Sequence, residues 1–222
     1  QMILLTGTTG KVGQHLVAEL AKKNVKLRIL ARDPSKVAKY REIGAELVQG
    51  DLLDPATLPA AFAGVEKLFL LTDSNETSVE AQHNAVRAAK KAGVKHLVRL
   101  SAAGTDFDSP VRLARWHAIT DAEIAASGIP FTILRPGFFM QNLFGSAPTI
   151  KDHGAFYGSV GEAKVAFIDA RDIAAAAAAV LTGPGHENKT YDLTGGEAIS
   201  NQELAALLTQ AVGKPVKYVS LP

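Results

Sequence analysis

Cysteine is absent from the 222 residues, and this absence excludes several kinds of chemistry. Without a thiol the chain can form no disulfide, hold no metal through thiolates and use no cysteine nucleophile. We expect no metal site of any kind. Long apolar runs are also missing, since none approaches the roughly 18 residues of a membrane span. The apolar start, Met2–Leu5, is too short for a signal peptide and follows no basic segment.

The chain also lacks a large excess of positive or negative charge. The chain has 24 Lys and Arg against 22 Asp and Glu, a net charge of +2, which is too small to predict a nucleic-acid partner. Hydrophobic residues make up 47%, so the chain is folded and long enough for a substantial core. We therefore expect a soluble, cytoplasmic protein, monomer or homodimer, that binds neither membrane nor nucleic acid.

Short β-type runs alternate with segments whose apolar residues recur every three or four positions, as at Val12, Leu16 and Leu20. Nearly continuous apolar strands that alternate with helices predict an α/β fold, a Rossmann-like doubly wound parallel sheet covered on both faces. The expected strands are residues 3–6, 26–30, 45–48, 67–71, 96–100 and 131–134.

Capping residues mark the ends of several expected helices. The dipeptides Asp33–Pro34 and Asp54–Pro55 place an N-cap before a proline at the first helical position. Gly93 and Gly128 predict C-terminal caps.

The regular pattern weakens after Pro136. Residues 137–161 are rich in aromatics, Gly and Pro and predict loops that form a pocket wall. Residues 164–181 predict a strand and an alanine-rich helix, and the chain closes with a strand at 189–193 and a helix at 201–213.

We find no internal repeat and no linker. The sequence therefore predicts a single NAD(P)-binding domain over residues 1–222. Its Rossmann core spans residues 1–136, and residues 137–222 form substrate-side loops and a small C-terminal substrate lobe.

Three glycines, Gly7, Gly10 and Gly13, fall where the first strand gives way to a helix that begins near Lys11. In a dinucleotide-binding turn the first glycine allows the tight turn, the second lets a pyrophosphate approach the backbone, and the third lets helix and strand pack closely. The helix N-terminus then offers N–H groups and a positive dipole to the phosphates. Because the triplet opens a β-α-β series, we interpret it as a dinucleotide-binding turn.

The second strand ends at Ala31 and Arg32, where NAD enzymes place an acidic residue. Asp33 is better explained as a helix cap. Arg32 offers a bidentate guanidinium for a 2′-phosphate, with Lys36 one helical turn away. Both cations can equally be solvated surface charges, but the pairing favours NADP(H) as cofactor, with NAD(H) binding more weakly.

Asp51 and Leu52 follow the third strand. They could flank an adenine, the aspartate at its amino group and the leucine at its face, or be a turn aspartate and a core leucine. The spacing leaves both interpretations open.

The chain resembles the NmrA-like, atypical short-chain dehydrogenase/reductase family, especially its bacterial NAD(P)H-dependent quinone, azo-dye and triphenylmethane-dye reductases. The resemblance covers nearly the whole chain and is most specific at "ILRPGFFMQN". The matching stretches are "LLTGTTGKVG", "LARDPSK", "GDLLD", "VKHLVRLSAAG", "ARWHAITDAEIAASGIPFTILRPGFFMQN" and "FIDARDIA".

The resemblance implies a set of cofactor-binding residues. Those at the pyrophosphate are Gly7, Thr9, Gly10, Lys11, Val12 and Gly13; Arg32 is at the 2′-phosphate; Asp51 and Leu52 are at the adenine; and Leu71, Thr72, Ser101, Ala102 and Ala103 are near the ribose and nicotinamide.

The chain departs from the wider superfamily at the Tyr-x-x-x-Lys pair, where it has Leu113 and His117. Leucine cannot donate a proton, which argues against the usual alcohol–ketone chemistry and is typical of the dye- and quinone-reducing branch. The candidate catalytic residue, His117, either contacts the nicotinamide ribose or relays a proton, or is structural, bonding a carbonyl or capping a helix. Relatives usually extend several tens of residues further, so we expect a short or partial substrate lobe.

A quinone, azo compound or triphenylmethane cation can accept a hydride without a strong acid if it stacks on the cofactor. We predict an NADPH-dependent oxidoreductase for such a conjugated acceptor. The alternatives are a non-catalytic NADP(H)-binding redox sensor that engages a regulatory protein and, less favoured, an epimerase or dehydratase. Each aromatic alone is better explained as core, but their crowding favours a substrate pocket formed by Trp116, Phe138, Phe139, Met140, Asn142, Phe156 and Tyr157.

Overall fold

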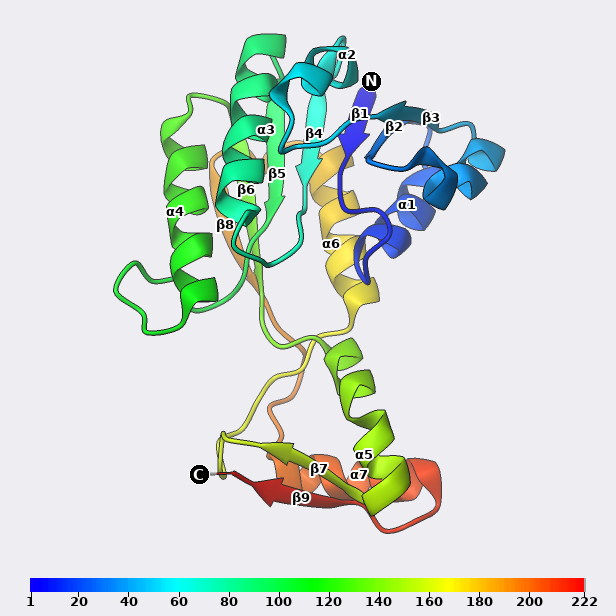
Figure 1. Cartoon of the computed structure of the whole chain (residues 1–222), viewed down its shortest axis with the longest axis vertical. Coiled ribbons are helices and arrows are strands. Elements are labelled where there is room, and N and C mark those ends of the chain that lie inside the picture. The colour runs from blue at the N-terminus through cyan, green and yellow to red at the C-terminus, as the bar shows by residue number, and fades with distance from the viewer. Residues whose placement is uncertain (222) are drawn as a thin grey trace. The chain divides into compact units, whose positions relative to one another are not determined.

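Seven strands form one parallel sheet in the computed structural model, which describes residues 1–221. The strand order is β3-β2-β1-β4-β5-β6-β8, and each neighbouring pair is parallel. This order confirms the Rossmann-like doubly wound fold expected from the sequence (Figure 1). The strands are β1 (Met2–Leu5), β2 (Lys26–Ala31), β3 (Glu46–Gln49), β4 (Lys67–Leu70), β5 (His96–Leu100), β6 (Phe131–Pro136) and β8 (Lys189–Leu193).

Helices cover both faces of this sheet. Helices α2, α3 and α4 lie on one face, and α1 and α6 lie on the other (Figure 1). The helices are α1 (Gly13–Ala21), α2 (Leu58–Phe62), α3 (Ser78–Ala92), α4 (Arg112–Ala126) and α6 (Ala170–Thr182), with 3-10 helices η1 (Pro34–Ile43) and η2 (Pro55–Thr57). The two predicted N-caps are confirmed, because Asp33 accepts from Ser35 N and Asp54 accepts from Ala56 N. None of the helices among residues 1–221 combines the length and the apolar character that crossing a bilayer requires.

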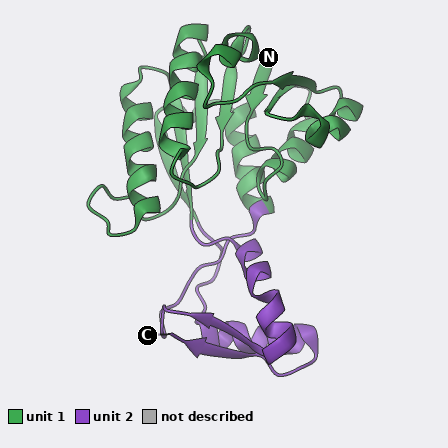
Figure 2. Ribbon diagram, in the orientation of Figure 1, with its two compact units in different colours: residues 1–136, 171–193 green, residues 137–170, 194–222 purple. Residues whose placement is uncertain are grey.

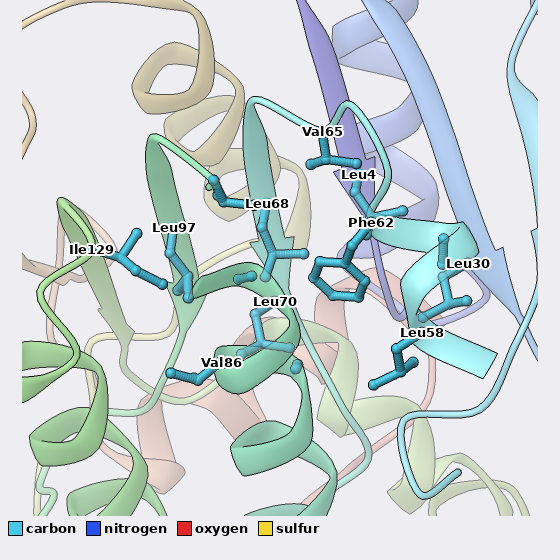
Figure 3. Packing of buried hydrophobic residues seen from close by; sticks show 14 of the residues in the cluster. Leu4, Leu30, Leu58, Phe62, Val65, Leu68, Leu70, Val86, Leu97 and Ile129 are labelled. Carbon is cyan, nitrogen blue, oxygen red and sulfur yellow. The ribbon is translucent and has the colours of Figure 1, made fainter. Parts of the chain in front are cut away.

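The core on the α2–α3 face is built from alternate strand residues. Leu68 and Leu70 of β4 point toward Phe62 of α2 and Val86 of α3, as Figure 3 shows. The intervening Phe69 is also fully buried, since strand side chains alternate between faces. Burial on both faces is why these strands read as continuous apolar runs.

The chain divides into two compact units (Figure 2). Unit 1 contains residues 1–136 and 171–193, and unit 2 contains residues 137–170 and the chain from Thr194 onward. The sequence-based boundary, which assigned all of 137–222 to the lobe, differs at 171–193. That segment belongs to unit 1 because β8 continues the sheet beside β6, with Leu134 opposite Tyr191.

Unit 2 has its own elements and core. They are η3 (Met140–Ser146), α5 (Ala147–His153), β7 (Ala155–Gly158), α7 (Asn201–Val212) and β9 (Lys217–Ser220). Strands β7 and β9 pair in parallel, and Phe156, Phe167 and Leu204 are buried at the centre of the unit.

Two expectations for this region are wrong. Residues 137–161 are not all loop: Pro148 lies in the first turn of α5 and Gly154 ends it in the left-handed conformation, the ordinary signals of a short helix. The strand expected at the start of 164–181 does not form. Val165 and Ile168 each make a single β-bridge, to Ile199 and Phe139 respectively, so no ladder develops.

The position of Phe62 predicts a large stability loss on truncation. Its side chain is 1% exposed and is packed among β1, β2, β4 and α3 residues, so Phe62→Ala should reduce the free energy of unfolding by about 3–5 kcal/mol. Urea unfolding measures this. The matched control, Phe107→Ala, removes a ring that is 57% exposed in the same unit and should change stability little; equal losses in the two variants would contradict the assignment of the core.

Candidate active site

Contacts within the chain explain two of the three glycines in the turn between β1 and α1. Gly7 has φ +67°, and a Cβ there would lie 2.7 Å from Leu71 Cγ and 2.8 Å from Leu71 O. A Cβ at Gly13 would lie 2.1 Å from Gly7 O. The first glycine therefore serves a left-handed turn and the third serves close packing of helix against turn.

No close contact within the chain and no positive φ requires a glycine at position 10. Its hypothetical Cβ would meet only Gly7 O, at the ordinary distance of 3.4 Å, and its φ is not positive. Gly10 is exposed, as are Thr9 and Lys11, whereas the Val12 side chain is in the core. Helix α1 then starts without a side-chain cap or an acidic residue in its first turn. This turn can accept an anion close to the backbone at Gly10.

A groove at the carboxyl ends of β1, β2, β3 and β4 adjoins this turn. It lies wholly within unit 1, and it includes eight of the predicted cofactor residues: Gly7, Thr9, Arg32, Lys36, Asp51, Leu52, Leu71 and Thr72. The segment after β4 also lines the groove, through four residues that were not predicted from the sequence: Asp73, Asn75, Thr77 and Ser78. The parallel order supplies the signal that would have found it, because carboxyl ends of parallel strands share one edge.

Arg32 extends from the end of β2 into solvent and lies beside a carboxylate that the sequence analysis did not anticipate. Its side chain is 72% exposed, and Nη2 is 3.8 Å from Asp73 Oδ2. The bonds from Ser35 to the Asp33 cap lower the pKa of that carboxyl. Arg32 and Lys36 thus present two cations at one end of the groove, with Asp73 as a competing anion for the first.

Asp51 and Leu52 have the structural roles that were one of the two interpretations of their spacing. Asp51 is a turn aspartate, since its Oδ1 accepts from Leu53 N at 2.9 Å. Leu52 is partly buried against the core, and Asn84 donates to its carbonyl at 2.9 Å. Both residues nevertheless line the groove.

A buried ionic network lies behind the groove. Arg99, in the middle of the sheet on β5, has no exposed surface. Its Nη1 bonds to Asp121 of α4, and its Nε donates to Gln82 Oε1 of α3 at 2.7 Å. Burial lowers the pKa of Arg99 to about 10, against the opposing attraction of Asp121, so the guanidinium stays charged at neutral pH.

Ser101 to Ala103 follow β5 and continue its pairing. Ser101 N donates to Leu134 O and Ala103 N to Pro136 O, so the backbone of this segment is fixed, with Ala102 between them. The hydroxyl of Ser101 donates to Asp121 Oδ2 at 2.9 Å. The three predicted residues therefore lie at the carboxyl end of the sheet, and Ser101 contacts the network.

His117 is part of the same network. Arg99 Nη2 lies 2.9 Å from His117 Nδ1. Burial lowers the pKa of His117 to about 4, and the charge of Arg99 lowers it further than Asp121 raises it. The imidazole is therefore neutral near pH 7 and neither bonds a carbonyl nor caps a helix through Nδ1. Relay of a proton by a cationic His117 at near-neutral pH is not supported by these surroundings.

Leu113, one turn before His117 on α4, is 38% exposed. Its side chain has no ionisable proton and can act neither as an acid nor as a base. Trp116, between them, is half-buried. No three His, Asp or Glu side chains of the described chain are grouped as a metal ion would require.

The remaining predicted substrate residues belong to unit 2. Phe138 is exposed and stacks edge-on against Phe167, and Met140 and Tyr157 are also exposed. Phe139 is half-buried, and the Asn142 backbone donates to its carbonyl. Phe156 differs from the expectation of a pocket residue, because it is buried against Tyr218 in the core of the unit.

Sheet order, glycine turn and groove together define a Rossmann-like α/β protein of the doubly wound class. Residues 1–222 match the NmrA-like family, and the chain belongs to that family, which confirms the resemblance seen in the sequence. An NAD(P)H azoreductase from Xenophilus azovorans is 44% identical over 99% of this chain and 77% of its own length.

Two solved structures are also similar. An NADPH-dependent quinone oxidoreductase from Escherichia coli, in complex with NADPH, has a TM-score of 0.93 at 38% identity and covers 99% of this chain and 78% of its own. A triphenylmethane reductase from Citrobacter sp. has a TM-score of 0.91 at 31% identity, over 100% and 79% of the two chains.

The neutral His117 predicts a pH-dependent stability. Between about pH 6.5 and pH 4 the unfolded chain binds a proton at this position and the folded chain does not. Lowering the pH through this window therefore destabilises the fold, by at most about 1.4 kcal/mol per pH unit from this group. Urea unfolding of wild type and His117→Gln at pH 7, 6 and 5 measures the difference in slope.

His117→Gln should show the shallower loss of stability on acidification. Some slope remains in both proteins, because burial also lowers the pKa of His96. His153→Gln, which replaces an exposed histidine, is the control and should keep the wild-type slope. Identical slopes in wild type and His117→Gln would contradict the neutral assignment.

Proposed function

We propose that the chain is an NADPH-dependent reductase that transfers a hydride to a conjugated electrophile such as a quinone, an azo compound or a triphenylmethane compound. Its family and its similarity to an azoreductase and to a quinone oxidoreductase support NAD(P)H-dependent oxidoreduction. The observation that carries the proposal is the free space at Gly10, a glycine that the fold itself does not need.

The glycine turn fits a diphosphate. Residues 7–13 would hold it, with the backbone at Gly10 in close approach and the uncapped N-terminus of α1 directed at its charge. Asp51 and Leu52 would border the adenine, and Thr72 and residues 101–103 would lie toward the ribose and nicotinamide.

The two cations at the end of β2 fit a 2′-phosphate. A phosphate there would bond Arg32 and attract Lys36, and it would displace the exposed contact between Arg32 and Asp73. An exposed ion pair contributes at most about 1 kcal/mol, whereas a hydrogen bond between charged groups contributes about 1.5–3 kcal/mol. The exchange therefore favours NADPH over NADH.

The acceptor chemistry follows from residues in the first two turns of α4. A bound nicotinamide dinucleotide supplies the hydride. Leu113 offers no proton, and a neutral His117 is a weak acid, so the chain suits acceptors whose added electrons delocalise on arrival. Trp116, beside His117 on the same helix, would orient a flat acceptor, and orientation is then the main contribution of the protein.

Gly10→Val tests the turn. The branched side chain should occupy the space of the diphosphate and abolish NADPH binding, while the protein stays folded because nothing in the chain lies closer than 3.4 Å to a Cβ there. Fluorescence titration with NADPH measures binding, and circular dichroism checks folding. Gly196→Val, at another glycine with open space and no positive φ, is the control and should bind normally. Unchanged NADPH affinity in folded Gly10→Val would remove this turn from the site.

Arg32→Ala tests the cofactor preference. Loss of the guanidinium should weaken NADPH binding about 10- to 100-fold and leave NADH binding nearly unchanged. Calorimetric titration with each nucleotide measures both. Lys39→Ala, which removes an exposed cation of η1 outside the groove lining, is the matched control. Equal losses for the two nucleotides in Arg32→Ala would show that Arg32 does not recognise the phosphate.

The reaction class is tested by NADPH oxidation against a panel of quinones, azo dyes, triphenylmethane dyes and simple ketones. We expect turnover with the conjugated compounds and little with the ketones, since a ketone needs a proton donor that Leu113 cannot supply. Binding of NADPH without turnover of any acceptor would instead indicate a sensor. Oxidation of secondary alcohols with NADP⁺ as fast as quinone reduction would require an acid–base residue and would overturn the proposal.

A further inference from the structure

Burying the charged side chain of Arg99 in a central strand is unfavourable for the free energy of folding. A guanidinium with no exposed surface loses its hydration, and an apolar side chain of similar volume at such a place is often neutral or stabilising. Its neighbours in β5, Val98 and Leu100, are apolar and buried. Stability of the sheet therefore does not account for a cation at this position. The hydrogen bonds that Arg99 makes indicate a different role.

Arg99 is the donor in every hydrogen bond that its side chain makes. A guanidinium has five N–H donors, accepts nothing and stays protonated in proteins. Its Nη2 bonds to His117 Nδ1 at 2.9 Å, which makes Nδ1 an acceptor. The ring proton of neutral His117 must then be on Nε2, because a neutral imidazole has one donor and one acceptor nitrogen.

The same rule fixes the amide of Gln82. Arg99 Nε donates to Gln82 Oε1 at 2.7 Å, so the amide nitrogen faces the other way and donates to Thr72 Oγ1 at 3.0 Å. Thr72 lines the groove. With its oxygen accepting from Gln82, the Thr72 hydroxyl proton is directed elsewhere and can be donated to a ligand.

Asp121 completes the pattern. The carboxylate receives Arg99 on one oxygen and the Ser101 hydroxyl on the other. Arg135 of β6 also donates to that second oxygen, from Nε at 3.1 Å and Nη2 at 2.9 Å. Asp121 thus balances the cations, and the charged groups that act on His117 are Arg99 from β5 and Asp121 from its own helix.

We propose that Arg99 is a positioning residue that fixes His117 as a permanent donor through Nε2–H and Gln82 as a donor toward the groove. Its role in turnover rests on the proposed reductase function, in which a neutral N–H donor of fixed direction orients the bound nucleotide. The donor pattern itself is a property of the protein alone.

Histidine NMR tests this on the whole chain without added nucleotide. The protein is labelled with ¹⁵N-histidine, and long-range ¹H–¹⁵N correlations are recorded from pH 5 to pH 8; the His117 signals are those missing in His117→Asn. We expect a protonated Nε2 and an unprotonated Nδ1 over the whole range. In the wild-type protein, a protonated Nδ1, or titration of His117 near its ordinary pKa of 6.5, would by itself overturn the proposal.

Variants of Arg99 test its role. In Arg99→Met, His117 should populate both tautomers and its pKa should rise from about 4 toward the ordinary value. Arg99→Lys, which keeps a charged donor, should restore the Nε2–H form at least in part. The matched control is Arg135→Gln, which removes a different cation from Asp121 and should leave the His117 tautomer unchanged. A single Nε2–H tautomer in folded Arg99→Met would refute the proposal.

The same variants give a kinetic readout if the chain turns over quinones. Arg99→Lys should retain more kcat than Arg99→Met at equal folded fraction. If no acceptor is reduced, the proposed function fails, while the NMR result still decides whether Arg99 sets the tautomer. Should Arg99→Met not fold, the wild-type spectra and Arg99→Lys decide the matter.

Discussion

A positive charge buried in the middle of a parallel sheet is the constraint on which the rest of the candidate site depends. Arg99 has no exposed surface, so its charge is tolerable only while Asp121 lies against it. That requirement ties α4 to β5 and brings His117, four residues before Asp121 on the same helix, to the guanidinium. Removing Asp121 would leave the buried charge of Arg99 without its counter-ion, a loss of about 3–5 kcal/mol. The position of α4 and the chemistry of the site therefore cannot vary independently.

The parallel topology adds the second layer of organisation. Consecutive strands end at one edge, so segments far apart in the sequence, such as Gly7, Arg32 and Thr72, line one groove. Within that groove the structure separates residues the fold needs from residues that a ligand would need. Gly13 is required by the contact with Gly7, whereas the glycine at position 10 and the exposed Arg32 have no comparable internal role. This separation is stronger evidence than the motif, because spacing alone cannot tell a tight turn from an anion cradle.

Much of the fold could be predicted from the sequence, because strands buried on both faces and capped helices leave local signals. The Asp33 cap and the positions of strands β1 to β6 are examples. The network could not be predicted in this way. Arg99 lies within a predicted strand, but arginine is rarely buried, and its partner Asp121 is 22 residues away on α4. Only a tertiary contact shows that this arginine is internal. The ion pair of Arg32 with Asp73 was missed for the same reason.

The chemistry available at α4 limits the products that the proposed reaction can release. Reduction of a ketone leaves an alkoxide, which is about as strong a base as hydroxide. Reduction of a quinone leaves a phenolate, whose pKa is near that of tyrosine, about 10. The alkoxide is therefore a far stronger base than the phenolate, and its formation needs a proton donor that the phenolate does not need. Leu113 cannot donate, and a neutral imidazole at His117 is far too weak an acid to transfer a proton fully. A site of this composition is therefore suited to acceptors that stabilise their own charge, while the fixed N–H donor that we propose at His117 would orient the bound nucleotide.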